Sequence, residues 1–233
     1  MVDRFLFQIQ QPKMKEIWHN ECGDIWDKNP KCLIIGITGS IGSGKTTAAK
    51  LFSKHGYNRI DADEIGHQII TKNSAAYKRI INKFGIGILD KNNINRNRLG
   101  DVVFNDNSKL KELNSITHPL IINEIKNQIK KIKQKCGNKT KIVIDAPLLL
   151  ETKTENLVDN VVVVRCDKKN ILKRNKKYPR EKIERILKLQ MPLDEKIKRA
   201  DFVIDNNKDL GHLEKQVKDV IEKLDMINRR GKK

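Results

Sequence analysis

The chain has 233 residues, of which 38% are hydrophobic and 33% are charged, and its formal net charge is +19. This length and composition fit a soluble globular protein with one sizeable core, and they exclude a membrane-spanning helix, because no apolar run approaches the roughly 18 residues that such a helix needs. The four cysteines form no CxxC pair and no metal-like spacing with histidine, so we expect free thiols in a reducing compartment at Cys22, Cys32, Cys136 and Cys166.

Residues 1–30 differ from the rest of the chain. They contain both tryptophans, Trp18 and Trp26, and end at Pro30. The apolar stretch FLFQI near the start is too short for the core of a signal peptide, and no small-residue cleavage site follows it. We therefore expect an N-terminal extension of unknown role on a cytoplasmic protein.

A short apolar run, CLIIGI at 32–37, predicts the first buried strand. It leads into GSIGSGKT, from Gly39 to Thr46, which matches the pattern G-x-x-x-x-G-K-[ST] in full. Apolar positions at helical spacing follow, and Gly56 is placed to end the helix. A strand before such a loop and a helix after it predict a phosphate-binding loop.

The chemistry of this loop indicates nucleoside triphosphate binding. Its glycines let the backbone N–H groups turn inward around phosphate oxygens, where the start of a helix adds a favourable dipole. Lys45 can reach the β- and γ-phosphates, and the hydroxyl group of Thr46 can ligate Mg²⁺. The motif leaves the reaction open.

The next stretch, YNRIDADEIG, reads as a second strand that runs into a polar turn. On a strand, Asp61 and Asp63 would point to the same side. A hydroxyl acceptor needs a carboxylate to orient it and to take its proton, and either aspartate has the right chemistry. The alternative is a structural role, with Asp63 as the cap of the helix that follows.

The middle of the chain, 65–135, is predicted to be helical and rich in Asn and Lys. The expected helices are 75–85, 97–105, 108–117 and 118–135. The last two are separated because Pro119 restricts His118 to an extended or turn conformation at a helix start. A lone histidine such as His118 is more often structural than a substrate contact.

Three further strands are expected, at 141–151, 159–167 and 200–207, followed by an amphipathic helix at 210–224 and a basic tail. Asp145 follows the apolar run KIVI, where an acidic group near a Mg²⁺ shell would lie, although a turn cap is the alternative. Alternating strands and helices predict an α/β fold, with a mostly parallel sheet covered by helices on both faces.

The basic segment 168–200 precedes the last strand. It contains Arg174, Arg180 and Arg185, which fit either a lid that closes over a triphosphate or a solvated basic helix. Charge alone favours the solvated helix.

The order of these motifs resembles that of the dephospho-coenzyme A kinase family. The matching stretches cover roughly residues 33–222 and read IGITGSIGSGKTTAAKLFSKHG, IDADEIGHQII, FGIGILDKNNINRNRL, VFNDNSKLKELNSITHP, IDAPLLLE, VVVV, LKRN and LKLQMPLDEKIKRADFVIDNN. The set is far more specific than the phosphate-binding loop alone.

The resemblance implies a P-loop kinase that uses ATP and Mg²⁺ to phosphorylate the ribose 3′-hydroxyl of dephospho-coenzyme A. It implies a nucleotide-binding core at 31–64 and 138–224 with a lid at about 168–190, a helical acceptor-binding region at 65–137, and a tail at 225–233.

The resemblance also implies roles for single residues. Asp63 is similar to the base on the ribose hydroxyl, with Lys45 and Asp61 as its catalytic neighbours. Arg96 and His118 correspond to the acceptor side, and Thr46 and Asp145 to the metal site. The nucleotide would be bound by Gly39, Gly42, Ser43, Gly44, Lys45, Thr46, Thr47, Arg174 and Asn206.

One departure from the family concerns the lid. The family usually has a second lid arginine shortly after the first, but Lys176 or Lys177 stands at that distance here, and Arg180, on a different turn, is the other candidate for its place. Lysine lacks the bidentate fork of arginine, so equivalence does not follow.

Other acceptors and another protein class are the alternatives. A kinase for a nucleoside monophosphate needs arginines to clamp an anionic acceptor. The IDAD pair instead indicates a neutral hydroxyl as the acceptor, and shikimate also offers such a hydroxyl. The net charge alone favours a nucleic-acid-associated ATPase, but the lysines are spread along the chain and no base-stacking pattern accompanies them. We expect dephospho-coenzyme A as the partner, no membrane or nucleic acid, and a monomer or small homo-oligomer.

Overall fold

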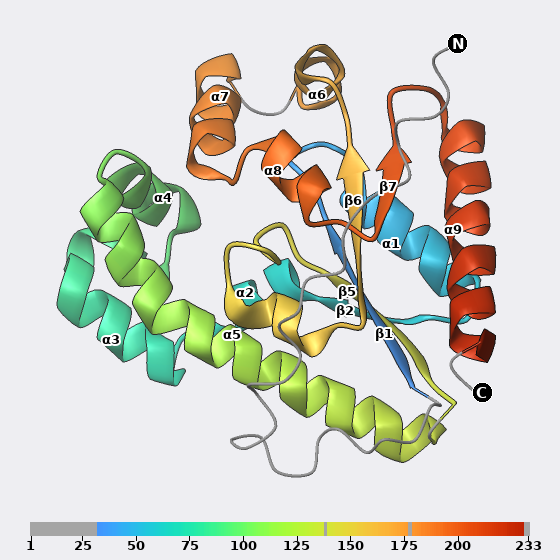
Figure 1. The fold of residues 1–233 in the computed structure, drawn as a ribbon. Coiled ribbons are helices and arrows are strands. Elements are labelled where there is room, and N and C mark those ends of the chain that lie inside the picture. The colour runs from blue at the N-terminus through green and yellow to red at the C-terminus, as the bar shows by residue number, and fades with distance from the viewer. Residues whose placement is uncertain (1–31, 138, 177–178, 231–233) are drawn as a thin grey trace. The chain divides into compact units, whose positions relative to one another are not determined.

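The structure is a computed structural model that describes residues 32–137, 139–176 and 179–230 (Figure 1). The predictions for residues 1–30, for Lys177 and for the end of the basic tail lie outside these described residues.

Five parallel strands form the central sheet in the order β2-β5-β1-β6-β7. Their bounds are β1 (Leu33–Thr38), β2 (Asn58–Asp61), β5 (Lys141–Asp145), β6 (Asn160–Arg165) and β7 (Phe202–Asp205). The central strand β1 is buried along its whole length, as expected of a strand covered on both faces. The predicted α/β fold with a mostly parallel sheet is confirmed.

Helices cover the two faces of this sheet (Figure 1). On one face lie α1 (Lys45–Lys54) and α9 (Leu210–Arg230), and on the other lie α2 (Ala62–Ile69), the second half of α5 (Asn107–Cys136), η2 (Lys153–Leu157) and α8 (Leu193–Lys198). Side chains alternate across a strand, so Ile35 and Ile37 enter the first core while Ile34 enters the second.

The helical region between β2 and β5 has a hydrophobic core of its own. It consists of α3 (Ala75–Phe84), η1 (Ile86–Ile88), β3 (Leu89–Asp90), β4 (Asn93–Ile94), α4 (Arg96–Phe104) and the first half of α5. The small antiparallel pair β3–β4 was not predicted. Its turn places Lys91 and Asn92 at φ 46° and 65°, in the left-handed region.

The two helices predicted on either side of His118 are one continuous helix of 30 residues, α5, with Pro119 inside it. The predicted break at His118 is therefore wrong. The reason is tertiary packing: Ile116 is buried in the core of the helical region, whereas Ile125 and Ile129 are buried against the sheet. One helix bridges two cores, and this burial outweighs the cost of a proline inside it.

The polar turn expected after the second strand is also wrong. β2 ends at Asp61, and α2 begins at the next residue. The side chain of Asp61 accepts a hydrogen bond from the backbone N–H of Glu64 at 3.1 Å. Asp61, and not Asp63, is therefore the cap of this helix, and Asp63 lies in the first helical turn.

The predicted lid contains α6 (Lys168–Arg174) and α7 (Arg180–Leu189). Ile171 and Ile183 from these helices are buried with Cys166, and Ile41 of the phosphate loop packs against them. Arg185 of α7 donates to Asn105 Oδ1 at 2.6 Å, at the end of α4. The lid helices thus contact both the phosphate loop and the helical region.

Candidate active site

The phosphate loop takes a conformation that only glycine adopts readily at two of its positions. Gly42 and Gly44 have φ values of 70° and 92°. A Cβ atom at Gly44 would lie 2.1 Å from Asn206 Nδ2, and one at Gly42 would lie 1.8 Å from Asn175 Nδ2. These asparagines pack directly against the loop. The positive φ and the lack of space for a Cβ atom both explain why residues 42 and 44 are glycines.

Side chains from distant segments hold the loop. Asn206 Nδ2 donates to the carbonyl oxygen of Ser43 at 2.7 Å, and the backbone N–H of Ile41 donates to Gln190 Oε1 at 3.0 Å. The hydroxyl group of Ser43 is buried and has no hydrogen-bond partner among the described residues. The loop ends at α1, which starts with Lys45, so the unpaired N–H groups of the first helical turn face the site.

Two carboxylates lie side by side at the ends of β2 and β5, where Asp61 and Asp145 are register partners. Arg59 lies two residues before Asp61 on the same strand. Its Nη2 forms an ion pair with Asp61 and a second ion pair with Asp145 Oδ2 at 2.7 Å. Asp145 is buried, and its Oδ1 has no hydrogen-bond partner among the described residues. One oxygen of Asp145 therefore remains available.

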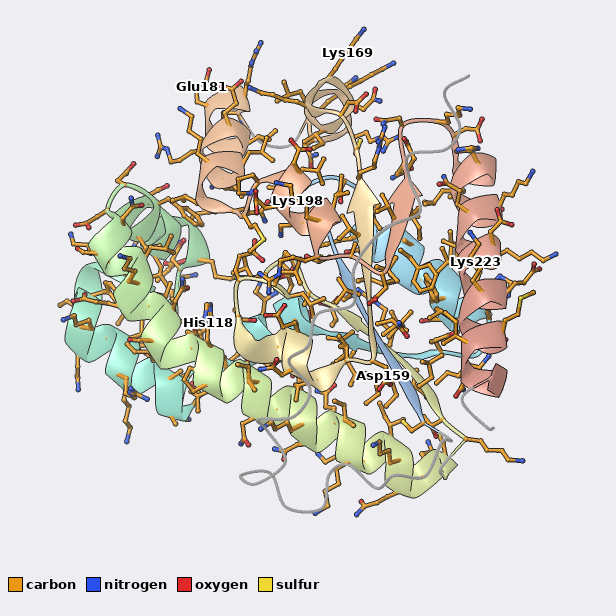
Figure 2. All side chains as sticks on the ribbon, viewed as in Figure 1. His118, Asp159, Lys169, Glu181, Lys198 and Lys223 are labelled. Carbon is orange, nitrogen blue, oxygen red and sulfur yellow. The ribbon has the colours of Figure 1, made fainter. Side chains whose placement is uncertain are left out.

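Asp63 lines a pocket together with His118 from α5 and with Ala146, Pro147 and Leu148 from the loop after β5. Figure 2 labels His118 on α5. Partial desolvation raises the pKa of the Asp63 carboxyl, Asp61 and Asp145 act in the same direction, and the charge of Lys45 opposes them. The pocket brings the predicted base and His118 together. Pro147 of its lining accepts a hydrogen bond from Thr38, the residue directly before the phosphate loop.

His118 is half-buried, and desolvation lowers the pKa of its imidazole. Arg96 is exposed in the first turn of α4. It is not among the described residues that line this pocket. Of the two residues expected on the acceptor side, only His118 therefore lines the pocket together with Asp63.

Arg174 and Asn206 meet at the ends of β6 and β7. Arg174 donates to the carbonyl oxygens of Asn206 and Lys208 at 2.8 and 3.1 Å. The backbone N–H of Asn206 donates to the carbonyl oxygen of Arg165. Arg180 instead pairs with Glu184 on its own helix, at 3.3 Å. The roles of Arg174 and Arg180 toward a nucleotide remain predictions.

The residues present fit a magnesium site of the kind that P-loop kinases use. Among the described residues, no group of three or more His, Cys, Asp or Glu side chains is arranged to hold a metal ion. Mg²⁺ at such sites keeps water and phosphate ligands and needs only one or two protein groups. The hydroxyl of Thr46 and the unpartnered, buried Asp145 Oδ1 are groups of this chemistry.

Sequence reasoning gave no role to four residues that shape this site: Arg59, Gln190, Glu151 and Lys196. The strand pattern contained a usable signal for Arg59, because a residue two positions before Asp61 shares its side of the sheet. No local signal marks the other three, since each contacts a segment far away in the sequence.

A sequence model of the dephospho-CoA kinase family matches residues 33–212. The chain belongs to this family. Dephospho-CoA kinase of Lactobacillus johnsonii is 41% identical over 195 residues, which are 82% of this chain and 97% of the relative. The Fusobacterium nucleatum protein of the same name is 42% identical over 189 residues, which are 79% and 95% of the two chains.

Solved structures agree with this assignment. A Thermus thermophilus protein has a TM-score of 0.69 and 28% identity over 83% of this chain and 98% of its own. Dephospho-CoA kinase from Campylobacter jejuni has a TM-score of 0.55 and 28% identity over 82% and 97%. The family resemblance and the kinase class are thus confirmed, while the residue roles and domain boundaries remain predictions.

Proposed function

We propose that this protein transfers the terminal phosphoryl group of ATP to the ribose 3′-hydroxyl of dephospho-coenzyme A, with Asp63 as the general base. The observation that supports the proposal most directly is the position of Asp63. It lines a pocket at the end of the sheet where substrates of α/β folds bind.

The phosphate loop binds ATP in this proposal. The backbone N–H groups of residues 39–46 and the buried Ser43 hydroxyl surround the phosphates, and Lys45 contacts the β- and γ-phosphates. Arg174 and Asn206 lie on the side of the nucleotide base and lid. Thr46 and Asp145 would hold Mg²⁺, and bound Mg²⁺ would neutralise phosphate charge.

Asp63 suits the role of base better than Asp61. Both oxygen atoms of the Asp61 carboxylate already have partners, because Oδ1 caps α2 and Oδ2 forms an ion pair with Arg59. Asp63 faces the pocket instead, and it orients the acceptor hydroxyl and takes its proton during in-line transfer. Asp61 then acts by fixing the start of the helix that carries Asp63.

The remaining assignments complete the proposal. His118 contacts the acceptor from α5, and Arg96 binds it from the edge of the helical region, which spans about 65–137. None of the helices in the described part of the chain is long and apolar enough to cross a membrane. Cytoplasmic location, a monomeric or small homo-oligomeric state and the absence of a nucleic-acid partner remain expectations.

A comparison of acceptors tests the reaction. ADP release is measured with dephospho-coenzyme A, AMP, uridine monophosphate and shikimate side by side. We expect turnover of dephospho-coenzyme A alone. Turnover of another acceptor in its place, or hydrolysis of ATP stimulated by RNA or DNA, would refute the proposal.

A pair of matched substitutions tests the role of Asp63. Asp63→Asn should lower kcat by roughly a hundredfold or more and leave the Kd for ATP within a few-fold, because a positioned base contributes that much. Asp61→Asn is the control, since asparagine caps a helix as well as aspartate does and should retain far more turnover. Retained turnover in Asp63→Asn would assign Asp63 a structural role.

A further inference from the structure

A buried polar cluster beside the site has no part in the mechanism described so far. Its centre is Lys196 on α8, which has 0% solvent exposure. The ammonium group lies 2.7 Å from Glu151 Oε1, 2.8 Å from the carbonyl oxygen of Pro147 and 3.5 Å from Thr38 Oγ1. Burying an ammonium group raises the free energy of the folded protein unless oxygen atoms surround it. These three oxygen contacts therefore fix the position of the Lys196 side chain and of the groups that it contacts.

The three oxygens belong to segments that face the two substrates. Thr38 is the last residue of β1, directly before the phosphate loop. Pro147 lines the pocket that contains Asp63, and Glu151 ends the same loop. The hydroxyl of Thr38 also donates to the carbonyl oxygen of Pro147 at 3.0 Å. Lys196 therefore bridges the strand that leads into the phosphate loop and the loop that lines the acceptor pocket.

The connection between the lid and α8 joins the same cluster. Glu151 Oε1 accepts a second hydrogen bond, from the backbone N–H of Met191 at 3.0 Å. The neighbouring residue, Gln190, accepts from the N–H of Ile41 within the phosphate loop. Burial lowers the pKa of Lys196, Glu151 opposes this, and the charge of Lys45 adds to the lowering. The cluster thus lies between Thr38, which directly precedes the phosphate loop, and Pro147, which lines the pocket around Asp63.

We propose that Lys196 is a positioning residue that holds the acceptor pocket in register with the phosphate loop. The proposal rests on the proposed function, because it takes the pocket around Asp63 as the acceptor site. Lys196 contacts no substrate and acts through Glu151 and the carbonyl group of Pro147. Without its ammonium group, residues 146–151 lose the donor that holds Glu151 and the carbonyl group of Pro147 together, and only the direct hydrogen bonds from Thr38 to Pro147 and from Ala146 to Ile37 still tie them to β1. In-line transfer is sensitive to displacements of this kind, because both substrates must be aligned.

The test compares Lys196→Met and Glu151→Gln with Lys198→Met. Lys198 is on the same helix and forms an exposed ion pair with Glu195, so it is a matched control (Figure 2). We expect Lys196→Met and Glu151→Gln to raise the KM for dephospho-coenzyme A about tenfold, while the Kd for ATP stays within about threefold. Lys198→Met should change neither. Each variant is assayed at a temperature at which its circular dichroism shows it to be folded.

The double variant Glu151→Gln/Lys196→Met separates positioning from stability. It removes both buried charges, so its Tm should recover toward the wild-type value, whereas its KM for dephospho-coenzyme A should stay raised. Recovery of KM together with Tm, or an unchanged KM in all variants, would overturn the inference while wild-type turnover remained. Failure of the wild-type protein to phosphorylate dephospho-coenzyme A would refute the proposed function and this inference with it.

Discussion

Arg59 shows how a single side chain organises the acceptor side of the site. Parallel pairing brings the carboxylates of Asp61 and Asp145 next to each other, and like charges at that distance repel. The guanidinium group of Arg59 contacts both carboxylates and compensates their charge. Asp63, two residues further along in the first turn of α2, forms no ion pair among the described residues and lines the pocket. Arg59 thereby compensates the charges of Asp61 and of the proposed metal ligand Asp145, and it leaves Asp63 as the carboxylate that lines the pocket.

The raised pKa of Asp63 predicts a pH dependence of turnover. A general base acts as the carboxylate, so kcat/KM for dephospho-coenzyme A should rise with pH through the pKa of Asp63. Desolvation raises this pKa, and bound ATP adds further negative charge nearby, so the acidic limb should lie above the usual range of aspartate. The measurement is a pH profile of kcat/KM at saturating ATP. A profile that stays flat into the usual aspartate range would contradict it.

Helix α5 connects the core of the helical region with the core on one face of the sheet. Its first half packs in the core of the helical region and its second half packs against the sheet. His118 lies between the two halves and lines the proposed acceptor pocket. The position of the pocket therefore depends on how this one helix joins two cores.

A continuous α5 predicts that the two cores unfold together. Ile116→Ala and Ile125→Ala each remove a buried side chain, one from each core, and each should lower the free energy of unfolding by about 2–5 kcal/mol. Thermal or urea unfolding should show one transition in both variants. Lys130→Ala, at an exposed position of the same helix, should change stability by less than about 0.5 kcal/mol. A second transition in Ile116→Ala would show that the helical region unfolds separately.

Over the described part of the chain, the phosphate loop and the predicted lid lie at the carboxyl ends of the parallel strands (Figure 1). Residues 146–148 of the proposed acceptor pocket directly follow β5 at the same edge. The full sequence has a formal net charge of +19. Both proposed substrates are polyanions, so long-range attraction should speed their association with the protein.

This charge predicts a salt dependence. Raising the ionic strength from low to physiological values shortens the screening length to about 8 Å, so kcat/KM for dephospho-coenzyme A should fall about tenfold while kcat changes far less. Steady-state kinetics in a KCl series measure this, with an uncharged osmolyte at equal osmolality as the control. An equal fall of kcat would show instead that salt acts on the folded protein.

Local sequence patterns were sufficient for the parallel strands, the phosphate loop and most of the helices. Apolar runs and glycine positions report on contacts within a few residues, so CLIIGI and GSIGSGKT were interpretable without a structure. The motif order was also sufficient for the family.

Contacts between distant segments could not be read in this way. The continuity of α5 depends on burial in two cores, which overrode the local preference around Pro119. The start of α2 is different, because its cap is a local hydrogen bond from Glu64 to Asp61. Arg59 and Asp145 are 86 residues apart, and Lys196 and Pro147 are 49 apart. No short pattern encodes such pairs, because it is the folding of the sheet that brings buried charges to their partners.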